Sequence, residues 1–155
     1  MDDDRECEAC ALASGTRELP GGLIHERHGW RVEHCVGPLG VGTLIVKPHR
    51  HVTAVADLTD NESAALGPLL RDASAVATAL TDADQVYNCL WSHAGGVPVH
   101  IHYVIQPVTA AQIESIGVYG PRLQVEMFER GEPPTTADVV DACERARELF
   151  KPSEA

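Results

Sequence analysis

One run of alternating residues near the middle of the chain, 97–107, constrains the fold more than any other segment. It reads Val-Pro-Val-His-Ile-His-Tyr-Val-Ile-Gln-Pro. Side chains in a β-strand point to opposite faces with a period of two. One face is therefore apolar, and the other carries His100 and His102. Paired imidazoles on a rigid strand suit metal ligation or nucleophilic chemistry, although a histidine on such a strand is more often an ordinary polar residue.

Length and composition fit one domain with an ordinary core. The chain has 155 residues, of which 44% are hydrophobic, and we expect 1–155 to form a single domain. Lys and Arg number 12 and Asp and Glu number 23, so the formal net charge is -11. A surface this acidic argues against general binding of nucleic acid or of an anionic membrane. Binding of a small anionic ligand by backbone amides and a few cations is still compatible with this net charge.

The beginning of the chain gives no sign of a targeting sequence. Residues 1–6, Met-Asp-Asp-Asp-Arg-Glu, have no apolar stretch of the kind found in a signal peptide. No run of residues approaches the length of a membrane span. We therefore expect a cytoplasmic protein with reduced thiols, in which the five cysteines do not form a disulfide framework.

Hydrophobic patterns elsewhere predict four more strands. The first two form a hairpin, the third is a short apolar run that ends at Lys47-Pro48, and the fourth precedes the histidine strand. Their ranges are 22–26, 30–36, 43–46 and 86–91. A loop is expected between the fourth strand and the histidine strand.

Two main helices are expected beside these strands. The first begins at the capping box that runs from Thr59 to Glu62 and keeps helical spacing to Leu80. Gly67-Pro68 conflicts with that pattern and predicts a kink or a break. The second helix is amphipathic and covers 135–150.

The segment between the histidine strand and the last helix is less regular in pattern. A short helix is expected over 112–116, and the Gly- and Pro-rich residues 117–134 predict irregular structure. Hairpin-connected strands with two main helices place the chain in the α+β class.

The order of these motifs resembles the histidine-triad (HIT) superfamily over about residues 7–107. That order is a CxxC pair, the hairpin, the apolar strand, a basic-proline segment, the capped helix and a glycine-led HxH strand that ends at Pro107. The resemblance implies a HIT-like fold, with a five-stranded antiparallel sheet and two main helices, and 108–155 as a C-terminal extension. It also implies a homodimer that acts on a small-molecule nucleotide.

The family pattern has three histidines at alternate positions, and this chain keeps two of them. With His100 as the first, Gly95 falls five residues before it and Pro107 falls on the family proline, whereas the alternative register displaces both. His102 then matches the middle histidine, which in the family attacks an α-phosphate and forms a nucleotidyl-histidine intermediate. Val104 takes the third position and cannot donate a hydrogen bond.

Candidate site residues follow from this register and from position along the chain. His102 and His100 are the expected catalytic residues, and a neutral imidazole with one free nitrogen is a suitable nucleophile. Asn88 resembles a family asparagine near the nucleoside, or is an ordinary polar residue at a strand end. Phosphate contacts are expected, by position alone, just before the histidine strand, and His93 has the alternative of a solvated loop residue. These candidates are Ser92, His93 and the backbone amides of Ala94 and Gly95.

A CxxC pair with two histidines has the composition of a tetrahedral structural zinc site. The chain resembles some bacterial HIT proteins with an N-terminal CxxC, which bind zinc through that pair, the histidine after the Lys-Pro segment and the first triad histidine. The resemblance therefore implies zinc on Cys7, Cys10, His51 and His100. His49 competes with His51 for this role, and the cysteines alone would be two reduced thiols.

The resemblance implies hydrolysis or transfer at a nucleotide α-phosphate, with dinucleoside polyphosphates or nucleoside phosphoramidates as the substrate class. Three other functions stay open. One is a nucleotidylyltransferase or phosphorylase, in which an acceptor other than water takes the nucleotide. Another is a nucleotide-binding module without turnover, which Gly96, Val97 and Val104 favour. The third is a zinc protein whose HxH pair serves only as ligand.

Overall fold

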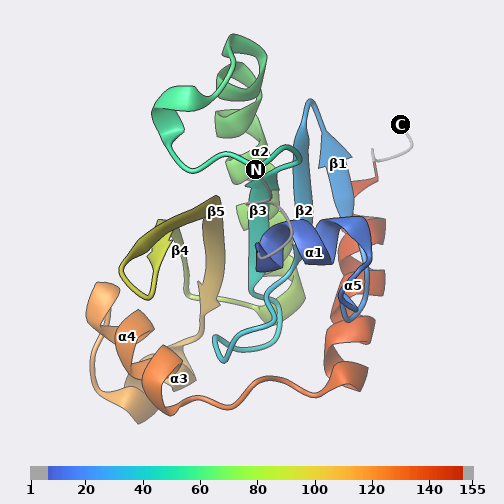
Figure 1. The fold of residues 1–155 in the computed structure, drawn as a ribbon. Helices are drawn as coiled ribbons and strands as arrows, with labels where there is room; N and C mark the ends of the chain where they lie inside the picture. The colour runs from blue at the N-terminus through green and yellow to red at the C-terminus, as the bar shows by residue number, and fades with distance from the viewer. Residues whose placement is uncertain (1–6, 152–155) are drawn as a thin grey trace.

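The computed structural model describes residues 7–151, which form a single antiparallel sheet with helices on both sides (Figure 1). The strands are His25–Arg27 (β1), Trp30–His34 (β2), Leu44–Pro48 (β3), Gln85–Ala94 (β4) and Val97–Val108 (β5). Their spatial order is β1-β2-β3-β5-β4. The predicted five-stranded antiparallel sheet in an α+β fold is therefore confirmed. The acidic segment 1–6, for which we predict no targeting role, lies outside the described residues.

Five α-helices and one short 3₁₀-helix complete the described chain. They are Glu8–Ser14 (α1), Val55–Asp57 (η2), Asp60–Thr81 (α2), Ala110–Ile116 (α3), Pro121–Arg130 (α4) and Thr136–Phe150 (α5). The two long helices, α2 and α5, match the two main helices that the sequence predicts. In residues 7–151, no helix combines the length and apolar character that crossing a membrane requires.

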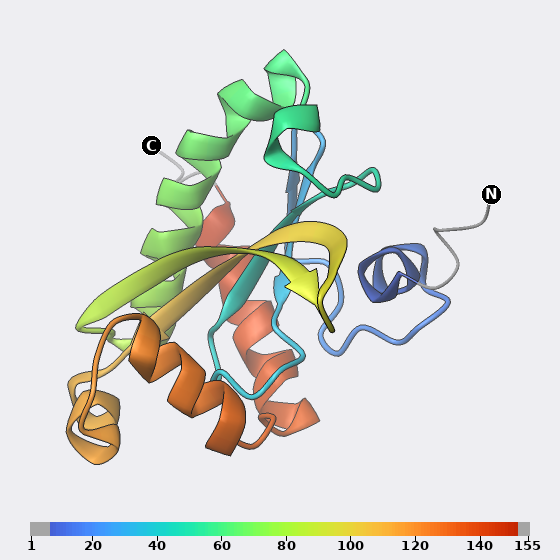
Figure 2. The same cartoon turned by 60° about the vertical axis from the view of Figure 1, so that its left-hand side comes forward.

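Alternation along the strands divides the sheet into two unlike faces. The face beneath α2 and α5 is apolar and forms the main core, with Trp30, Val32 and Val46 all fully buried. α5 joins this core through Val139, Cys143 and Ala146. Helix α1 lies on the other side of the sheet (Figure 2). The side chains that alternate with the core residues therefore face α1, and these include His102.

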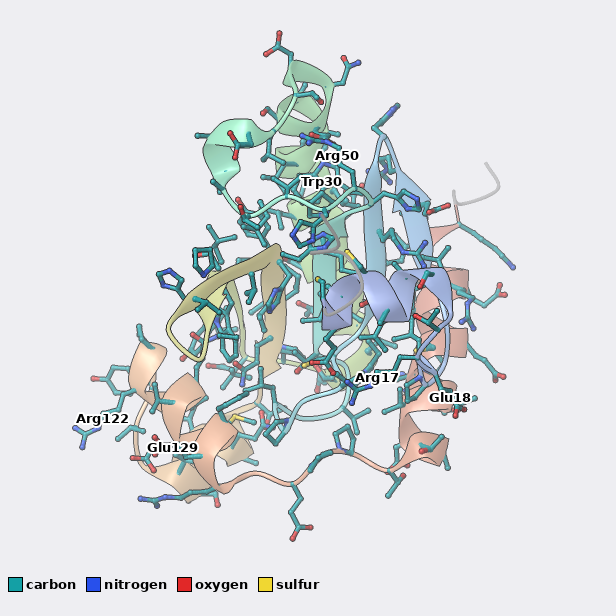
Figure 3. All side chains as sticks on the ribbon, in the orientation of Figure 1. Arg17, Glu18, Trp30, Arg50, Arg122 and Glu129 are labelled. Carbon is teal, nitrogen blue, oxygen red and sulfur yellow. The ribbon has the colours of Figure 1, made fainter. Side chains whose placement is uncertain are left out.

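The beginning of α2 is tied to the sheet through Glu62. The Glu62 carboxylate accepts two hydrogen bonds of 2.9 Å from the Arg50 guanidinium and closes a capping box with Thr59. The Trp30 indole donates to the Glu62 carbonyl oxygen at 2.9 Å, and Trp30 and Arg50 lie at the same end of α2 (Figure 3). These bonds fix the segment that leads from β3 into α2. The helix then runs through Pro68 without interruption, so of the two predicted alternatives the break is wrong, and the kink stays a prediction.

Two local predictions are corrected. Residues 117–134 are not irregular throughout, because α4 lies within them. Proline at the first turn and glycine after the last one are typical helix boundaries, and Pro121 and Gly131 occupy those places. The expected loop before the histidine strand is also shorter than predicted: β4 reaches Ala94, and only Gly95 and Gly96, both with positive φ, connect it to β5.

Candidate functional site

A row of four polar or aromatic side chains crosses the sheet on the face beneath α1. Arg31 on β2 pairs with Lys47 on β3, and His102 on β5 pairs with Trp91 on β4. Lys47 and His102 complete the row because the adjacent pair, Val46 and Tyr103, sets the register between β3 and β5. His102 therefore lies between a lysine on one side and a tryptophan on the other.

The ring of His102 is held in a defined orientation. Its Nδ1 lies 3.1 Å from the carbonyl oxygen of His100. A carbonyl oxygen only accepts, so Nδ1 must carry the proton, and Nε2 is left with its lone pair. Burial is the main cause that lowers the pKa of His102, and the Lys47 charge lowers it further, against the opposing effect of the His100 bond. His102 is therefore a neutral imidazole near pH 7, with the tautomer that a nucleophile requires.

His102 opens into a pocket with a volume of about 630 Å³. One wall is α1, which contributes Glu8, Ala9 and Leu12, and the opposite wall includes Phe128 of α4. The floor is the sheet face, with the histidines of β5. This volume lies within the range of small-molecule sites, which are about 300–1,000 Å³.

A buried ion pair closes one side of this pocket. The Lys47 ammonium donates to Glu33 Oε1 at 2.5 Å and to the carbonyl oxygen of Ala9 in α1 at 2.9 Å. The two charged side chains are 1% and 3% exposed, respectively. The second carboxylate oxygen of Glu33 is buried and has no hydrogen-bond partner among the described residues. Lys47 therefore compensates Glu33 and connects α1 to the sheet beside His102.

Aromatic side chains form the other side of the pocket. The Trp91 ring centroid lies 6.3 Å from that of His102 and 5.3 Å from that of Phe128, and the second contact is edge to face. Phe128 is 49% exposed, although it is a large apolar residue. The indole thus separates the histidine from an exposed phenyl ring at the pocket mouth.

The four predicted zinc ligands come together at the end of this pocket. The Sγ atom of Cys10 lies 3.4 Å from Nδ1 of His51 and 3.4 Å from Nδ1 of His100. With Cys7, these ligand atoms all lie within 4.8 Å of one another. Bonds of about 2.0 and 2.3 Å to one ion, at a tetrahedral angle, place nitrogen and sulfur at close to this separation. The geometry therefore fits a zinc ion.

The second nitrogen of His100 has the partner that a metal ligand needs. Its Nε2 donates to the carbonyl oxygen of Pro48 at 2.8 Å, which leaves Nδ1 directed at Cys10. Such outer hydrogen bonds fix the tautomer of ligating histidines. Burial lowers the pKa of His100 to about 4, so the ring is neutral. The competing His49 has a side chain that is 63% exposed and lies near Glu26, and the ligand cluster does not include it.

Val104 lies on the His102 face in apolar surroundings. It is 1% exposed and packs in a small cluster with Cys35 and Leu39, against Trp91 and Met127. In β5 it takes the position two residues after His102, so it is the next side chain on that face. The position to which the sequence register assigns the third histidine of the motif is therefore a methyl surface that offers no proton.

Of the five expected substrate contacts, Ala94 lines the pocket with His102, and the structure does not bring the other four there. Asn88 points to the opposite face, where its amide donates to Ser74 of α2 at 3.1 Å, because it is an odd number of residues from Trp91 along β4. Ser92 lies at a register irregularity, and His93 and Gly95 are exposed at the β4–β5 hairpin. None of these four lines the pocket, and a contact with phosphate stays a prediction for the last three.

Three residues of the pocket are not among those that the sequence predicts for the site, namely Glu33, Lys47 and Phe128. Glu33 and Lys47 are charged residues that alternate with apolar residues in their strands. This alternation is the sequence signal that places both side chains on the sheet face opposite the core, where His102 lies. Phe128 belongs to the segment expected to be irregular. Only the packing of α4 against β4 and β5 brings it to the pocket.

Comparison with solved structures finds the same fold in proteins of low sequence identity. A Hit-like protein from Bartonella henselae matches with a TM-score of 0.70 at 12% identity, over 94% of this chain and 97% of that one. A Zn-bound histidine triad family protein from Mycobacterium smegmatis gives 0.66 at 17% identity, over 94% of each chain. A hypothetical histidine triad nucleotide-binding protein from Sulfolobus tokodaii gives 0.68 at 18% identity, over 92% of this chain and 91% of that one.

Comparisons by sequence alone give no relative. No protein-family model matches the chain, and no curated protein matches it. Identities of 12–18% with structures that cover almost the whole chain show that the fold is shared. The HIT-like fold that the motifs predict is confirmed.

Proposed function

Because the chain has the fold of the histidine triad proteins, we propose that it binds a nucleotide in the pocket beside His102 and catalyses hydrolysis or transfer at the α-phosphate. The hydrogen bond from His102 Nδ1 to the His100 carbonyl carries this proposal. It fixes the tautomer in which Nε2 is an unprotonated nucleophile, on a side chain that lines the pocket.

The proposed reaction has two displacements at phosphorus. In the first, the Nε2 lone pair of His102 forms an N–P bond while the bond from phosphorus to the leaving group breaks, and the leaving group departs with that electron pair. In the second, an acceptor attacks phosphorus and loses a proton to solvent, the N–P bond breaks and His102 recovers its lone pair. With water as acceptor the reaction is hydrolysis, and with another acceptor it is nucleotidyl transfer.

We propose that Cys7, Cys10, His51 and His100 hold a zinc ion with a structural role. Four protein ligands leave no open position for water or substrate, so the ion would supply folding stability and no chemistry at phosphorus. The site would anchor α1, which forms one wall of the pocket. By family resemblance we also propose a homodimer. We propose a reducing compartment such as the cytoplasm, because the five cysteines, all within the described residues, form no disulfide.

A nucleotide-binding module without turnover is the second candidate function. The buried, apolar position of Val104 favours it, because no donor there stabilises the charge that develops on the leaving group. This candidate keeps the pocket and the zinc site and differs only in lacking the covalent step.

Trapping of the intermediate tests the proposal directly. The zinc-loaded protein is incubated with adenine and guanine nucleotides, quenched under alkaline conditions that preserve phosphohistidine, and examined by peptide mass spectrometry. We expect a nucleotidyl adduct on His102 and none in His102→Ala. Comparison of products in water and in phosphate buffer then identifies the acceptor. Measurable nucleotide affinity without adduct or product would establish the binding module instead.

A further inference from the structure

We propose that the substrate is a nucleoside monophosphate whose leaving group is an uncharged aromatic ring seated against Trp91 and Phe128, and not a dinucleoside polyphosphate. This inference rests on the proposed function at His102 and narrows its substrate class. It follows from three separate observations: the apolar mouth of the pocket, the charges in its lining, and the side chain at position 104.

The first observation is the apolar mouth of the pocket. Val36, Val97 and Phe128 are 45%, 58% and 49% exposed, and all three line the same pocket. Exposed apolar residues are ordinary when scattered singly, but a group of them around one cavity marks a ligand contact. Trp91 connects this group to His102 through centroid separations of 5.3 and 6.3 Å. A flat ring attached to the phosphorus that His102 attacks would lie within reach of both aromatic side chains.

The second observation is the charge of the pocket lining. Among the described residues that line it, Lys47 is the one lysine or arginine, beside the acidic Glu8 and Glu33. The Lys47 ammonium already donates to Glu33 and to the Ala9 carbonyl, and both residues of the pair are buried. On α4, the nearby Arg122 points away from the molecule (Figure 3).

A polyphosphate is a poor fit to that lining. Such a leaving group carries several negative charges, and enzymes that bind one surround it with cations or with metal ions. Once the Lys47–Glu33 pair is counted as neutral, Glu8 is the one remaining carboxylate of the described lining, and it pairs with Arg17 at 2.8 Å, so this lining offers no unpaired lysine or arginine to a polyphosphate. A phosphodiester carries a single charge, and an uncharged substituent adds none, so this substrate class suits the pocket.

The third observation concerns protonation of the leaving group. A general acid contributes about 10²–10⁴-fold to rate when the leaving group must gain a proton. Val104 is the side chain that follows His102 on the same face, and it has no proton to give. An aryl oxide departs without a proton far more readily than an alkoxide, because a phenol has a pKa of about 10. The missing donor therefore disfavours an alkoxide leaving group, and among leaving groups that need no proton the uncharged aryl group is the one that the charge of the lining also favours.

The corresponding first step balances without a general acid. The lone pair of His102 Nε2 forms the N–P bond, the P–O bond to the aromatic oxygen breaks, and the aryl oxide leaves with the electron pair and takes a proton from solvent afterwards. Both rings of the Trp91–Phe128 pair contact the departing group in this arrangement. The P–O bond that breaks therefore lies between His102 and the apolar mouth of the pocket.

Binding is measured first, with the His102→Ala protein so that turnover does not interfere. Adenosine 5′-monophosphate, its methyl ester and its phenyl ester are compared by titration calorimetry. We expect the phenyl ester to bind more tightly than the methyl ester, by about two- to tenfold for a stacking contact. Adding Phe128→Ala should remove this preference, and Phe128→Tyr should retain it. Tyr119→Ala is the matched control, because Tyr119 is 76% exposed and does not line the pocket.

Turnover is measured second, with wild-type protein and a series of substituted phenyl esters. We expect the rate to rise as the phenol becomes more acidic, and the methyl ester to react at least about a hundredfold more slowly because its alkoxide needs a proton. Diadenosine tetraphosphate should also react more slowly than the phenyl ester, because the lining offers its polyphosphate no unpaired lysine or arginine. Equal affinity for the phenyl and methyl esters, or fastest turnover with the tetraphosphate, would overturn this inference while leaving the proposed function intact. No affinity for any of the nucleotides would overturn both.

Discussion

His102 Nδ1 donates to the carbonyl oxygen of His100 at a distance of 3.1 Å, so one histidine of the pair orients the other through the backbone of their shared strand. Both rings line the pocket, but the His100 ring contacts Cys10 and Pro48, whereas the His102 ring bonds only to the His100 carbonyl among the hydrogen-bond partners in the described chain. Two imidazoles on the same face of β5 thus have different partners. Because their partners differ, we expect substitution of His102 and substitution of His100 to have different effects.

His102→Ala should abolish turnover while leaving nucleotide affinity within about tenfold of wild type. A nucleophile acts mainly in the transition state, so its loss lowers kcat far more than it weakens binding. We expect a fall of at least about a thousandfold in kcat, measured by product chromatography. Unchanged turnover would refute the assignment of His102 as nucleophile. A normal far-ultraviolet circular dichroism spectrum is the control for folding.

Purified protein should contain about one zinc ion per chain, as a four-ligand site requires. Cys10→Ser should lose most of this zinc and lower the thermal midpoint, because metal binding is coupled to folding. Plasma mass spectrometry and calorimetry measure the two effects. Cys143→Ala is the matched control, since Cys143 is buried in the main core and is not in the ligand cluster. Metal-free protein with the same melting temperature would contradict the site.

Val104→His should raise the rate with substrates whose leaving group needs a proton, such as the methyl ester of adenosine monophosphate. A single donor at such a position is worth about 2.7–4 kcal/mol. The larger ring enters a packed cluster, so we also expect a loss of about 1–3 kcal/mol in stability. Val104→Leu enlarges the side chain without adding a donor. Equal rates for the histidine and leucine variants would show that the donor is not what the pocket lacks.

The contribution of Glu62 to stability should disappear at low pH. Hydrogen bonding to Arg50 is the main cause that lowers the pKa of Glu62 to about 2, against about 4.3 in an unfolded chain. A depressed folded-state pKa means that the stabilisation is fully present above the unfolded value and is lost as pH falls through the folded one. Urea titrations should therefore show Glu62→Gln to be less stable than wild type at pH 7.

Below about pH 4, the difference between Glu62→Gln and wild type should shrink toward zero as the unfolded carboxyl takes up its proton first. Glu148→Gln is the control, because the Glu148 side chain is 70% exposed and pairs with Lys151 only at the surface. A difference that stays constant between pH 7 and pH 3 would mean that packing, and not the ionised carboxylate, accounts for the loss.

Local patterns were enough to predict the strands, the capped helix and the CxxC half of the Cys–His cluster, whereas His51 and His100 were predicted by the family resemblance. Each depends on neighbours in the sequence: alternation for β5, the Thr59–Glu62 capping box for α2, and the CxxC spacing for one half of the metal cluster. The prediction for 117–134 was wrong because Gly and Pro were read as irregular structure. At Pro121 and Gly131 they are the two ends of a helix.

The sequence by itself determined the face on which His100, His102 and Val104 lie, because alternation along a strand is a property of the backbone. The tertiary structure decided what surrounds them. Lys47 and Glu33 reach His102 only through the register of three strands, and Phe128 reaches Trp91 only through the docking of α4. Such contacts join residues that are far apart in the chain, and the side chains that pack between them set their geometry.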